Sequence, residues 1–177
     1  MRLALLIAAA LLAAPGAALA ASTGPAATPA GDIPDNQVFL QYTSTTGRWS
    51  IRYPEGWART GGGTSVSFRD RSNAVKVAIA PGATPTPASL MRSVRVTPGA
   101  RPVGRSRTVK LSGGSAVELT FTAVAAPDPV TGKRLTITTD RYQVGRKGRV
   151  ATLDLSTPVG VDNVDAFRLI SNSFRWR

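Results

Sequence analysis

The sequence of 177 residues contains no histidine and no cysteine, and each absence excludes a class of chemistry. Without an imidazole or a thiol, the chain has neither a Ser-His-Asp nor a Cys-His nucleophile system. It also lacks His and Cys ligands for zinc or haem, sulfur for a disulfide, and a cysteine to carry a lipid anchor. Acidic residues are few, with ten Asp and Glu against 22 Lys and Arg. We therefore predict a protein that is not an enzyme, with no catalytic residues, no metal and no cofactor.

Long apolar runs are scarce too, and the one at the N-terminus has the features of an export signal. Arg2 gives a positive start, Leu3 to Ala14 form an apolar run of 12 residues, and small residues precede Ala21. A transmembrane helix needs about 20 apolar residues, so this run is short for an anchor. We expect cleavage after Ala20 and a secreted or periplasmic product without stable membrane insertion. A retained N-terminal anchor is the alternative.

The segment that follows the signal differs in composition from the rest of the chain. Residues 21–37 are mostly Ala, Thr, Gly and Pro, and Ile33 is the only large apolar side chain among them. Ordering such a segment costs conformational entropy that the burial of so few apolar groups does not offset. We therefore expect a flexible linker over 21–37 and one folded domain over 38–177.

From Val38 onward, apolar and polar residues alternate with the two-residue period of β-strands. The pattern predicts strands at 38–43, 48–53, 65–69, 74–80, 106–111, 116–124, 135–144 and 150–155. The glycines at 61–63 predict a flexible loop. Two helices are expected, one with Thr86 as its cap and Pro87 as its first residue, and one capped by Asp162. The fold class is therefore α+β, with a central antiparallel sheet of about seven strands sandwiched by helices.

Several of the few aromatic residues gather around one predicted strand. Trp49 and Tyr53 share a face of the strand 48–53 with Ile51, and Trp57 follows the next turn. They could form an exposed recognition surface, but large aromatic side chains that alternate on a strand are more often core residues. We therefore expect Trp49, Tyr53 and Trp57 to be core residues.

The segment Tyr53-Pro54-Glu55-Gly56-Trp57 ends this strand, and such a strand end near the start of a small exported domain resembles the PsbP-like family. The predicted hairpin ending at Ile79, the strand with Arg141-Tyr142 and a final helix running into Ser173-Phe174 also fit. The resemblance covers residues 38–176. It implies a central antiparallel sheet between helices and a non-catalytic role.

Members of the PsbP-like family have different roles. Plant members are extrinsic subunits of photosystem II that help to retain calcium and chloride, another relative of the fold partners a small GTPase, and many bacterial relatives are exported. The photosynthetic role is not carried over to this chain. It has no His to match metal-binding histidines, and its linker has no recognisable photosystem-docking segment. A fold does not by itself settle a function.

The chain is strongly basic, with a formal net charge of +12 at pH 7. Removal of Arg2 with the signal leaves 21 basic and ten acidic residues, a net charge of +11. On an exported protein, this charge favours anionic envelope polymers, lipid headgroups or acidic protein partners. Nucleic acid is not expected, because of the export and because the chain lacks an alternating aromatic and basic platform.

Candidate ligand-binding residues are basic side chains in and around one predicted hairpin, namely Arg141, Arg146, Lys147, Arg149, Lys133 and Arg134. If the strands on either side of the turn at 145–148 pair, Arg146 and Lys147 lie at the tip of the hairpin. Arg141 and Arg149 would then lie below it. Planar guanidinium groups suit phosphate or carboxylate groups. A solvated turn without a ligand is the alternative.

The carboxylates are scattered along the chain. Glu118 and Asp140 could face each other on adjacent strands, which leaves a carboxylate pair for glycoside hydrolysis open but unsupported. Asp162 and Asp165 are explained by helix capping. The segment 128–132 lacks the ligand density of a calcium loop.

Three functions are compatible with these observations. The leading hypothesis is a non-catalytic, exported and monomeric PsbP-like module that binds or scaffolds a protein partner or another component of the cell envelope. One alternative is a direct electrostatic binder of anionic envelope polymer or lipid headgroups. The other is an unrecognised secreted hydrolase.

Overall fold

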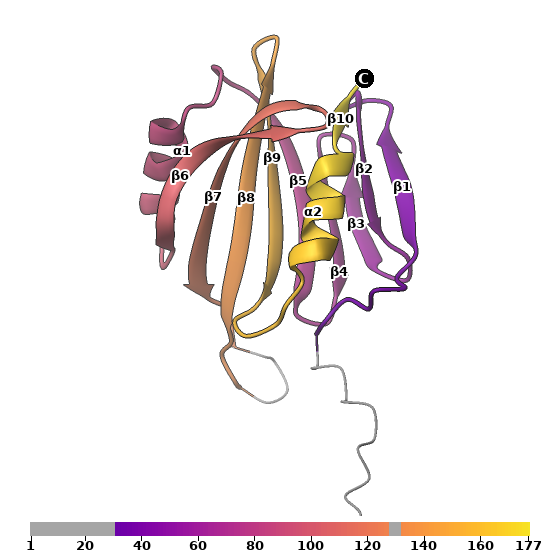
Figure 1. The fold of residues 1–177 in the computed structure, drawn as a ribbon, viewed down its shortest axis with the longest axis vertical. Coiled ribbons are helices and arrows are strands. Elements are labelled where there is room, and N and C mark those ends of the chain that lie inside the picture. The colour runs from indigo at the N-terminus through magenta and orange to yellow at the C-terminus, as the bar shows by residue number, and fades with distance from the viewer. Residues whose placement is uncertain (1–30, 128–131) are drawn as a thin grey trace, which may run out of the picture.

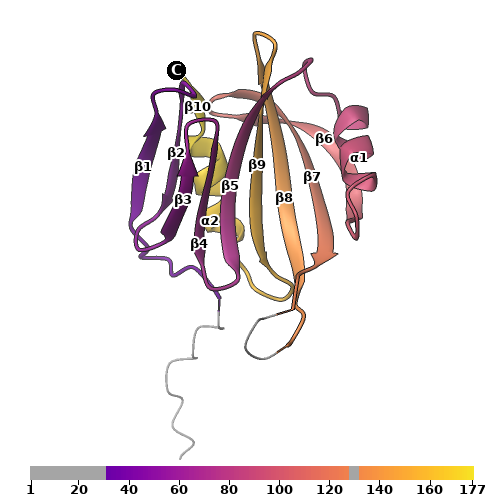
Figure 2. The ribbon, with the colours of Figure 1, turned by 180° about the vertical axis from the view of Figure 1, so that it is seen from behind.

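The computed structural model describes residues 31–127 and 132–177, which form two antiparallel sheets and two helices (Figures 1 and 2). The expected export signal at 1–20 and the expected linker residues 21–30 lie outside the described residues. So do residues 128–131 of the segment considered for calcium.

The larger sheet has seven strands in the order β3-β4-β5-β9-β8-β7-β6, and all neighbouring strands are antiparallel. Its strands are β3 (Ala58–Gly62), β4 (Ser65–Asp70), β5 (Asn73–Pro81), β6 (Arg101–Leu111), β7 (Gly114–Val124), β8 (Thr136–Arg146) and β9 (Arg149–Pro158). The expected antiparallel sheet is therefore confirmed, together with the β4–β5 and β8–β9 hairpins.

A separate sheet of three strands contains the first two predicted strands, in the order β1-β2-β10. Its strands are β1 (Phe39–Ser44), β2 (Trp49–Pro54) and β10 (Arg175–Trp176). One edge of the larger sheet is formed by β3, a strand that the sequence did not predict. The expected loop is wrong for Gly61 and Gly62, which pair with Val66 and Ser65. All five residues of β3 are exposed, so no apolar alternation marks this strand in the sequence.

The two helices cover opposite faces of the larger sheet. α1 (Pro87–Arg95) lies over β6 and β7, where its buried Leu90 and Val94 pack on the odd-numbered residues of β7. α2 (Val164–Ser173) lies on the other face, in front of the sheet in Figure 1 and behind it in Figure 2. The expected sandwich by helices is confirmed, with α1 confined to one end. No helix in 31–127 or 132–177 is long and apolar enough to cross a membrane.

The two helices begin in different ways. α1 begins as expected: Thr86 Oγ1 accepts from the Ser89 N–H at 3.1 Å, and Ser89 Oγ accepts from the Thr86 N–H at 2.9 Å. This reciprocal pair is a capping box. The expected cap of α2 is wrong by one residue, because Asn163 holds that position and makes no capping bond with its side chain. Asp162 instead accepts from the Val164 N–H at 3.2 Å.

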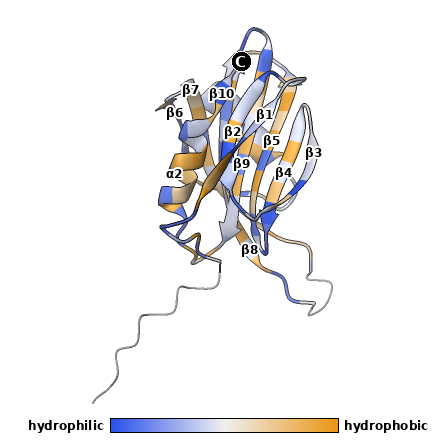
Figure 3. Ribbon diagram, turned by 90° about the vertical axis from the view of Figure 1, so that its right-hand side faces the viewer, coloured by the Kyte–Doolittle hydropathy of each residue, from blue (hydrophilic) through white to orange (hydrophobic). Residues whose placement is uncertain are grey.

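The main core lies between the two sheets and α2, and Trp49 is fully buried within it. The Trp49 indole N–H donates to the Gly63 carbonyl at 3.0 Å, and its ring stacks on Phe174 with centroids 6.2 Å apart. Tyr53 stacks on Phe68 at a centroid distance of 4.0 Å. Figure 3 shows hydrophobic and hydrophilic segments alternating along the strands. The prediction that these aromatic residues belong to the core is confirmed.

The last part of the expected linker, residues 31–37, contacts the domain. The Ile33 N–H donates to Asn163 Oδ1 at 2.7 Å, and the Gly31 carbonyl accepts from Asn73 Nδ2 at 2.6 Å. Ile33 also packs against the core. The attached part of the chain thus begins before the expected boundary. Composition does not reveal this, because the partners are buried Asn side chains far along the sequence.

The β8–β9 hairpin closes with a turn of two residues. Arg146 pairs with Arg149, and Lys147 and Gly148 between them have φ angles of 47° and 72°. Positive φ at both central positions defines a type I′ turn, whose twist matches that of the flanking strands. The β8–β9 ladder therefore extends beyond the predicted strands 135–144 and 150–155 to Arg146 and Arg149. The turn has two residues and not the four, 145–148, that the glycines suggested.

We expect Trp49→Ala to lower the free energy of unfolding by about 3–5 kcal/mol, the range for truncating a buried large aromatic side chain. Urea unfolding followed by circular dichroism measures this change. Val96→Ala, at a side chain that is 75% exposed, is the control. It should change the free energy by less than about 0.5 kcal/mol. An equally small effect of Trp49→Ala would contradict a core organised around this residue.

We expect Lys147→Asn to raise the free energy of unfolding by up to about 1 kcal/mol, because Asn tolerates positive φ better than Lys and is favoured in type I′ turns. The same urea experiment measures the gain. Lys110→Asn, an exposed position in β6, removes the same charge from extended backbone and should give no gain. Equal shifts in both variants would point to net charge and not to turn geometry.

Candidate anion-binding site

Segments far apart in the sequence meet at the end of the molecule that carries the C-terminus (Figure 1). The β8–β9 hairpin reaches this end, and its tip is fixed by a hydrogen bond of 2.9 Å from the Gly82 N–H to the Gly148 carbonyl. Arg146 and Lys147 at the tip are exposed, and Arg149 is half-buried. The sequence-based placement of Arg146 and Lys147 at a hairpin tip therefore agrees with the structure.

The C-terminal segment reaches the same end because β10 pairs with β2. Trp176 lies opposite Trp49 in this ladder, and the Arg177 N–H donates to the Arg48 carbonyl at 2.8 Å. Arg48 has a φ of 57° in the turn between β1 and β2. The pairing places Arg48 and Arg177 beside each other and next to the hairpin.

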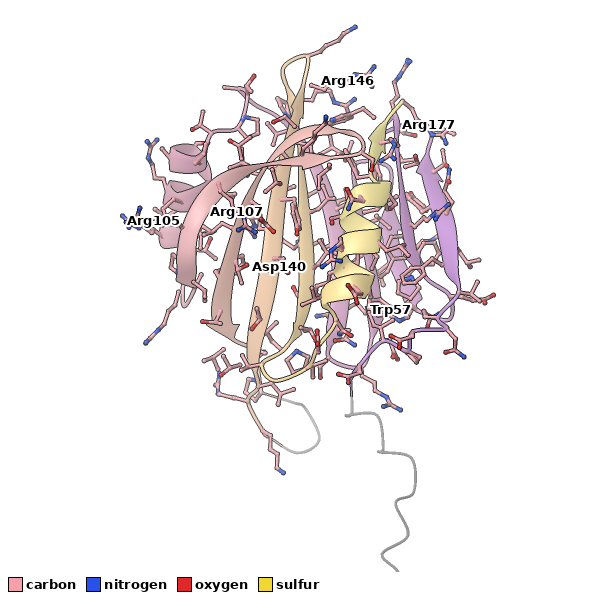
Figure 4. All side chains as sticks on the ribbon, in the orientation of Figure 1. Trp57, Arg105, Arg107, Asp140, Arg146 and Arg177 are labelled. Carbon is pink, nitrogen blue, oxygen red and sulfur yellow. The ribbon has the colours of Figure 1, made fainter. Side chains whose placement is uncertain are left out.

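Five basic side chains and one indole surround a hollow of about 180 Å³ at this end. We call this set the basic end, and it consists of Arg48, Arg146, Lys147, Arg149, Trp176 and Arg177. Arg149 joins its parts: its Nη2 donates to the Gly47 carbonyl at 3.0 Å, and its guanidinium carbon lies 5.4 Å from the centroid of the Trp176 ring. Figure 4 shows Arg146 and Arg177 at this end.

The cations of the basic end have no acidic partner in the described part of the chain. Within 31–127 and 132–177, no acidic residue lines the hollow. The recorded ion pairs lie elsewhere and join Arg107 to Glu118, Arg141 to Asp154, and Arg168 to Asp165. Like charges held together repel one another, and an anion placed between them relieves that repulsion. The geometry therefore suits phosphate, sulfate or carboxylate groups, with Arg providing planar two-point contacts.

The basic surface continues along the smaller sheet. A neighbouring hollow of about 400 Å³ is lined by Arg52, Arg175 and Arg177 together with polar side chains such as Ser50 and Ser173. Arg177 belongs to both hollows. An extended anion could therefore contact both.

The structure does not bring Arg141 together with the basic end. Arg141 lies on the α1 face of the sheet, where Nε and Nη2 donate to the two carboxylate oxygens of Asp154 at 2.7 Å each. The hydrogen bond to Asp154 raises the pKa of Arg141. Its guanidinium carbon also lies 5.0 Å from the ring centroid of Phe121. These contacts occupy the Arg141 guanidinium.

Lys133 and Arg134 are also remote from the basic end. Both are exposed and precede the start of β8, whereas Arg146 is its last residue. At about 3.3 Å per residue, the length of β8 corresponds to a separation of about 35 Å. Of the six candidate residues, the structure brings together Arg146, Lys147 and Arg149.

Sequence reasoning did not include Arg48, Trp176 and Arg177 among the candidates. They join the hairpin through the β2–β10 ladder, which links residues more than 120 positions apart. β10 has only two residues, too few to show a strand period. In the sequence, the alternation of Arg175, Trp176 and Arg177 was the one indication of a strand at this position.

Glu118 and Asp140, the other pair considered from the sequence, do lie on one face of adjacent strands. Glu118 is opposite Tyr142 and Asp140 is opposite Thr120 in the β7–β8 ladder. Both side chains line a third hollow, beside α2. They come from the same wall of that hollow and do not face each other across it.

Comparison with known proteins identifies the fold of this chain. No family model matches the sequence, and no curated protein matches it. The solution structure of cyanobacterial PsbP from Synechocystis aligns with a TM-score of 0.57 and 17% identity, over 84% of this chain and 99% of that chain. The Ran-binding protein Mog1p of Saccharomyces cerevisiae aligns with a TM-score of 0.52 and 8% identity, over 79% of this chain and 96% of that one. The resemblance noted in the sequence is thus confirmed at the level of architecture, and the chain has the PsbP-like fold.

Proposed function

We propose that this chain is a non-catalytic, exported binding module of the cell envelope, and that its basic end binds an anionic envelope component. The observation that carries the proposal is the convergence of five basic side chains around Trp176, in a hollow that no acidic residue lines among those the structure describes. The ligand carries phosphate, sulfate or carboxylate groups. The module acts as a monomer.

The backbone of the basic end is held at two points, which supports this proposal. Backbone hydrogen bonds fix both the hairpin tip, through Gly82, and the C-terminal segment, through Arg48. A backbone that is already held, together with the Arg149 guanidinium bonded to Gly47, loses less conformational freedom when an anion binds. Trp176 adds a flat apolar surface, and its ring already lies near the Arg149 guanidinium.

The N-terminal sequence supports export, and a binding role fits the fold. The charged start, the apolar run and the small residues before Ala21 have the order of a secretory signal. Mog1p, a protein of similar fold, is described as Ran-binding. That description belongs to Mog1p and supports only a general role in binding for this chain.

Binding of the mature domain to anionic probes should weaken when charge is removed from the basic end. The probes are vesicles containing phosphatidylglycerol and soluble polyphosphate, which separate a lipid source of phosphate from a polymer source. The triple variant Arg146→Ala, Lys147→Asn, Arg177→Ala removes three exposed charges. At about 0.5 kcal/mol per charge, affinity should fall about tenfold. Raising the salt concentration should also weaken binding by the wild type.

The matched control removes three charges from elsewhere on the surface. Arg92→Ala, Arg95→Ala and Arg134→Ala change exposed side chains outside the basic end and alter net charge by the same amount. This variant should keep most of the affinity. Equal losses in the two triple variants, or binding that does not depend on salt, would contradict the proposal.

Export predicts a defined mature N-terminus. When the full chain is expressed in a bacterium, intact-mass spectrometry of the extracytoplasmic fraction should find a protein that begins at Ala21. A variant with Leu6→Arg and Leu11→Arg, which interrupts the apolar run, should stay in the cytosol with its first residues retained. Unprocessed wild-type protein in the cytosol would contradict export.

A further inference from the structure

The smaller sheet carries a row of arginines on the face that points away from the core. Arg175 lies opposite Ser50 in the β2–β10 ladder, and Arg52 follows Ser50 by two residues along β2. Side chains two residues apart on a strand point to the same face, and so do side chains directly opposite each other. Arg52 and Arg175 therefore share one face, whereas Trp49 and Trp176 alternate with them and pack on the core.

The row continues to the basic end through Arg177. Arg177 follows Arg175 by two residues, and its N–H donates to the Arg48 carbonyl, so the pairing with the β2 side extends beyond β10. At about 3.3 Å per residue, Arg175 lies about 7 Å along the strand direction from Arg177 and about 7 Å from the level of Arg52. The row from Arg177 to Arg52 is therefore about 13 Å long. A chain with anionic groups at intervals matches such a row, whereas a single phosphate or carboxylate matches one position in it.

The row forms one side of a groove, and α2 forms the other. Leu169, Asn172 and Ser173 of α2 line the hollow of about 400 Å³ together with the arginines. α2 lies beside the smaller sheet (Figures 1 and 3). Because Arg177 lines this hollow and also the hollow of the basic end, the two form one continuous surface.

The cations of the groove lack an internal counter-charge. Among the residues that the structure describes, none that lines the groove is acidic, and no ion pair of Arg52 or Arg175 is recorded. Arg175 Nη1 donates to the Asn172 carbonyl at 2.5 Å and to the Phe174 carbonyl at 2.7 Å. These bonds hold the guanidinium beside the end of α2, while no partner of Nε or Nη2 is recorded in the described part of the chain. An anion can therefore accept from these two nitrogens.

The rest of the lining indicates what links the anionic groups. Leu169 is the one apolar side chain among the described residues that line the groove, and Gln41 and Asn172 present amide groups. Polar links between the charged groups suit such a lining better than hydrocarbon does. The headgroups of a membrane form a flat array, which reaches the exposed hairpin tip more easily than a groove between a helix and a sheet. The groove therefore favours a single polar chain over a membrane surface.

We propose that the basic end and this groove together bind a linear anionic polymer, which has one charged group in each polar repeat unit and runs from the hairpin tip past Arg177 and Arg175 to Arg52. The inference rests on the proposed function, because it takes the basic end as an anion site. It specifies the ligand as a polymer, as distinct from a lipid headgroup or a small free anion. The charged groups could be phosphodiesters or the carboxylates of uronic acids, which guanidinium groups bind in the same two-point manner.

Isothermal titration calorimetry of the mature protein with two polymers and their monomers tests the proposal. The probes are poly(glycerol phosphate) with glycerol phosphate, and polygalacturonate with galacturonate. The variant Arg52→Gln, Arg175→Gln removes two charges from the groove and none from the hairpin. It should lower the affinity for at least one polymer about fivefold, as expected for two exposed charge contacts. Its affinity for the monomers should change less than twofold, and the polymer that responds identifies the charged group.

The matched control is Arg92→Gln, Arg95→Gln, which removes two exposed charges from α1 on the opposite face of the larger sheet. It should change polymer affinity less than twofold. Thermal unfolding shows whether the variants are folded. If Arg175→Gln lowers the Tm, Arg52→Gln alone provides the test, because no side-chain contact of Arg52 is recorded among the described residues. This single variant should lose about twofold in polymer affinity.

Equal losses in the groove variant and its control would overturn the inference, and so would wild-type affinity in the groove variant. Vesicles containing phosphatidylglycerol supply the third arm. If the groove variant binds them as much more weakly as it binds the polymers, the face contacts a membrane and the polymer assignment is wrong. The basic end is judged separately, by the triple variant of Arg146, Lys147 and Arg177. A loss in that variant without a loss in the groove variant would leave the proposed function standing and this inference refuted.

Discussion

The packing of Trp49 joins the two sheets, and the rest of the structure depends on it. Its ring is fully buried, its N–H donates to the Gly63 carbonyl at the β3–β4 turn, and it stacks on Phe174 just after α2. The backbone at Gly47 passes so close that a Cβ there would clash with the indole and with the Gly63 carbonyl. The same residue, Gly47, accepts the hydrogen bond from Arg149. The buried Trp49 side chain thereby positions the β3–β4 turn, the C-terminal segment and the basic end.

The basic end gathers five cations that have no acidic partner among the described residues. Arg48, Arg146, Lys147 and Arg177 are exposed, so water and salt weaken their mutual repulsion, and only Arg149 is half-buried. An anion bound between them would supply the counter-charge that these residues lack.

Local patterns predicted those parts of the fold that local interactions determine. The alternation of Val75, Val77 and Ile79 identified β5, and the Thr86-Pro87 pair identified the start of α1. Both agree with the structure. The division into two sheets was not predictable in this way, because a strand carries the same alternation whichever sheet it joins. β3 lacked any apolar pattern, and β10 was too short to show one.

The candidate site was predictable only in part for the same reason. Arg146, Lys147 and Arg149 are neighbours in sequence and in one hairpin, so a turn signal was enough to group them. Arg48 and Arg177 join them only after the C-terminal strand has paired with β2. Arg141 seemed equivalent to the others in sequence. In the structure, Arg141 points to the face of the sheet that α1 covers and pairs with Asp154, and it is therefore remote from Arg146, Lys147 and Arg149.

The point at which the chain enters the domain determines how the domain can be attached to anything else. Gly31 is held by Asn73, and Asn73 also accepts a hydrogen bond from Thr157 near the end of β9. Arg149 begins the same strand, and at about 3.3 Å per residue the two are about 26 Å apart. A support, tag or fusion partner attached before Gly31 therefore joins the domain at the end remote from the basic end. A domain tethered in this way would keep the basic end accessible to solution.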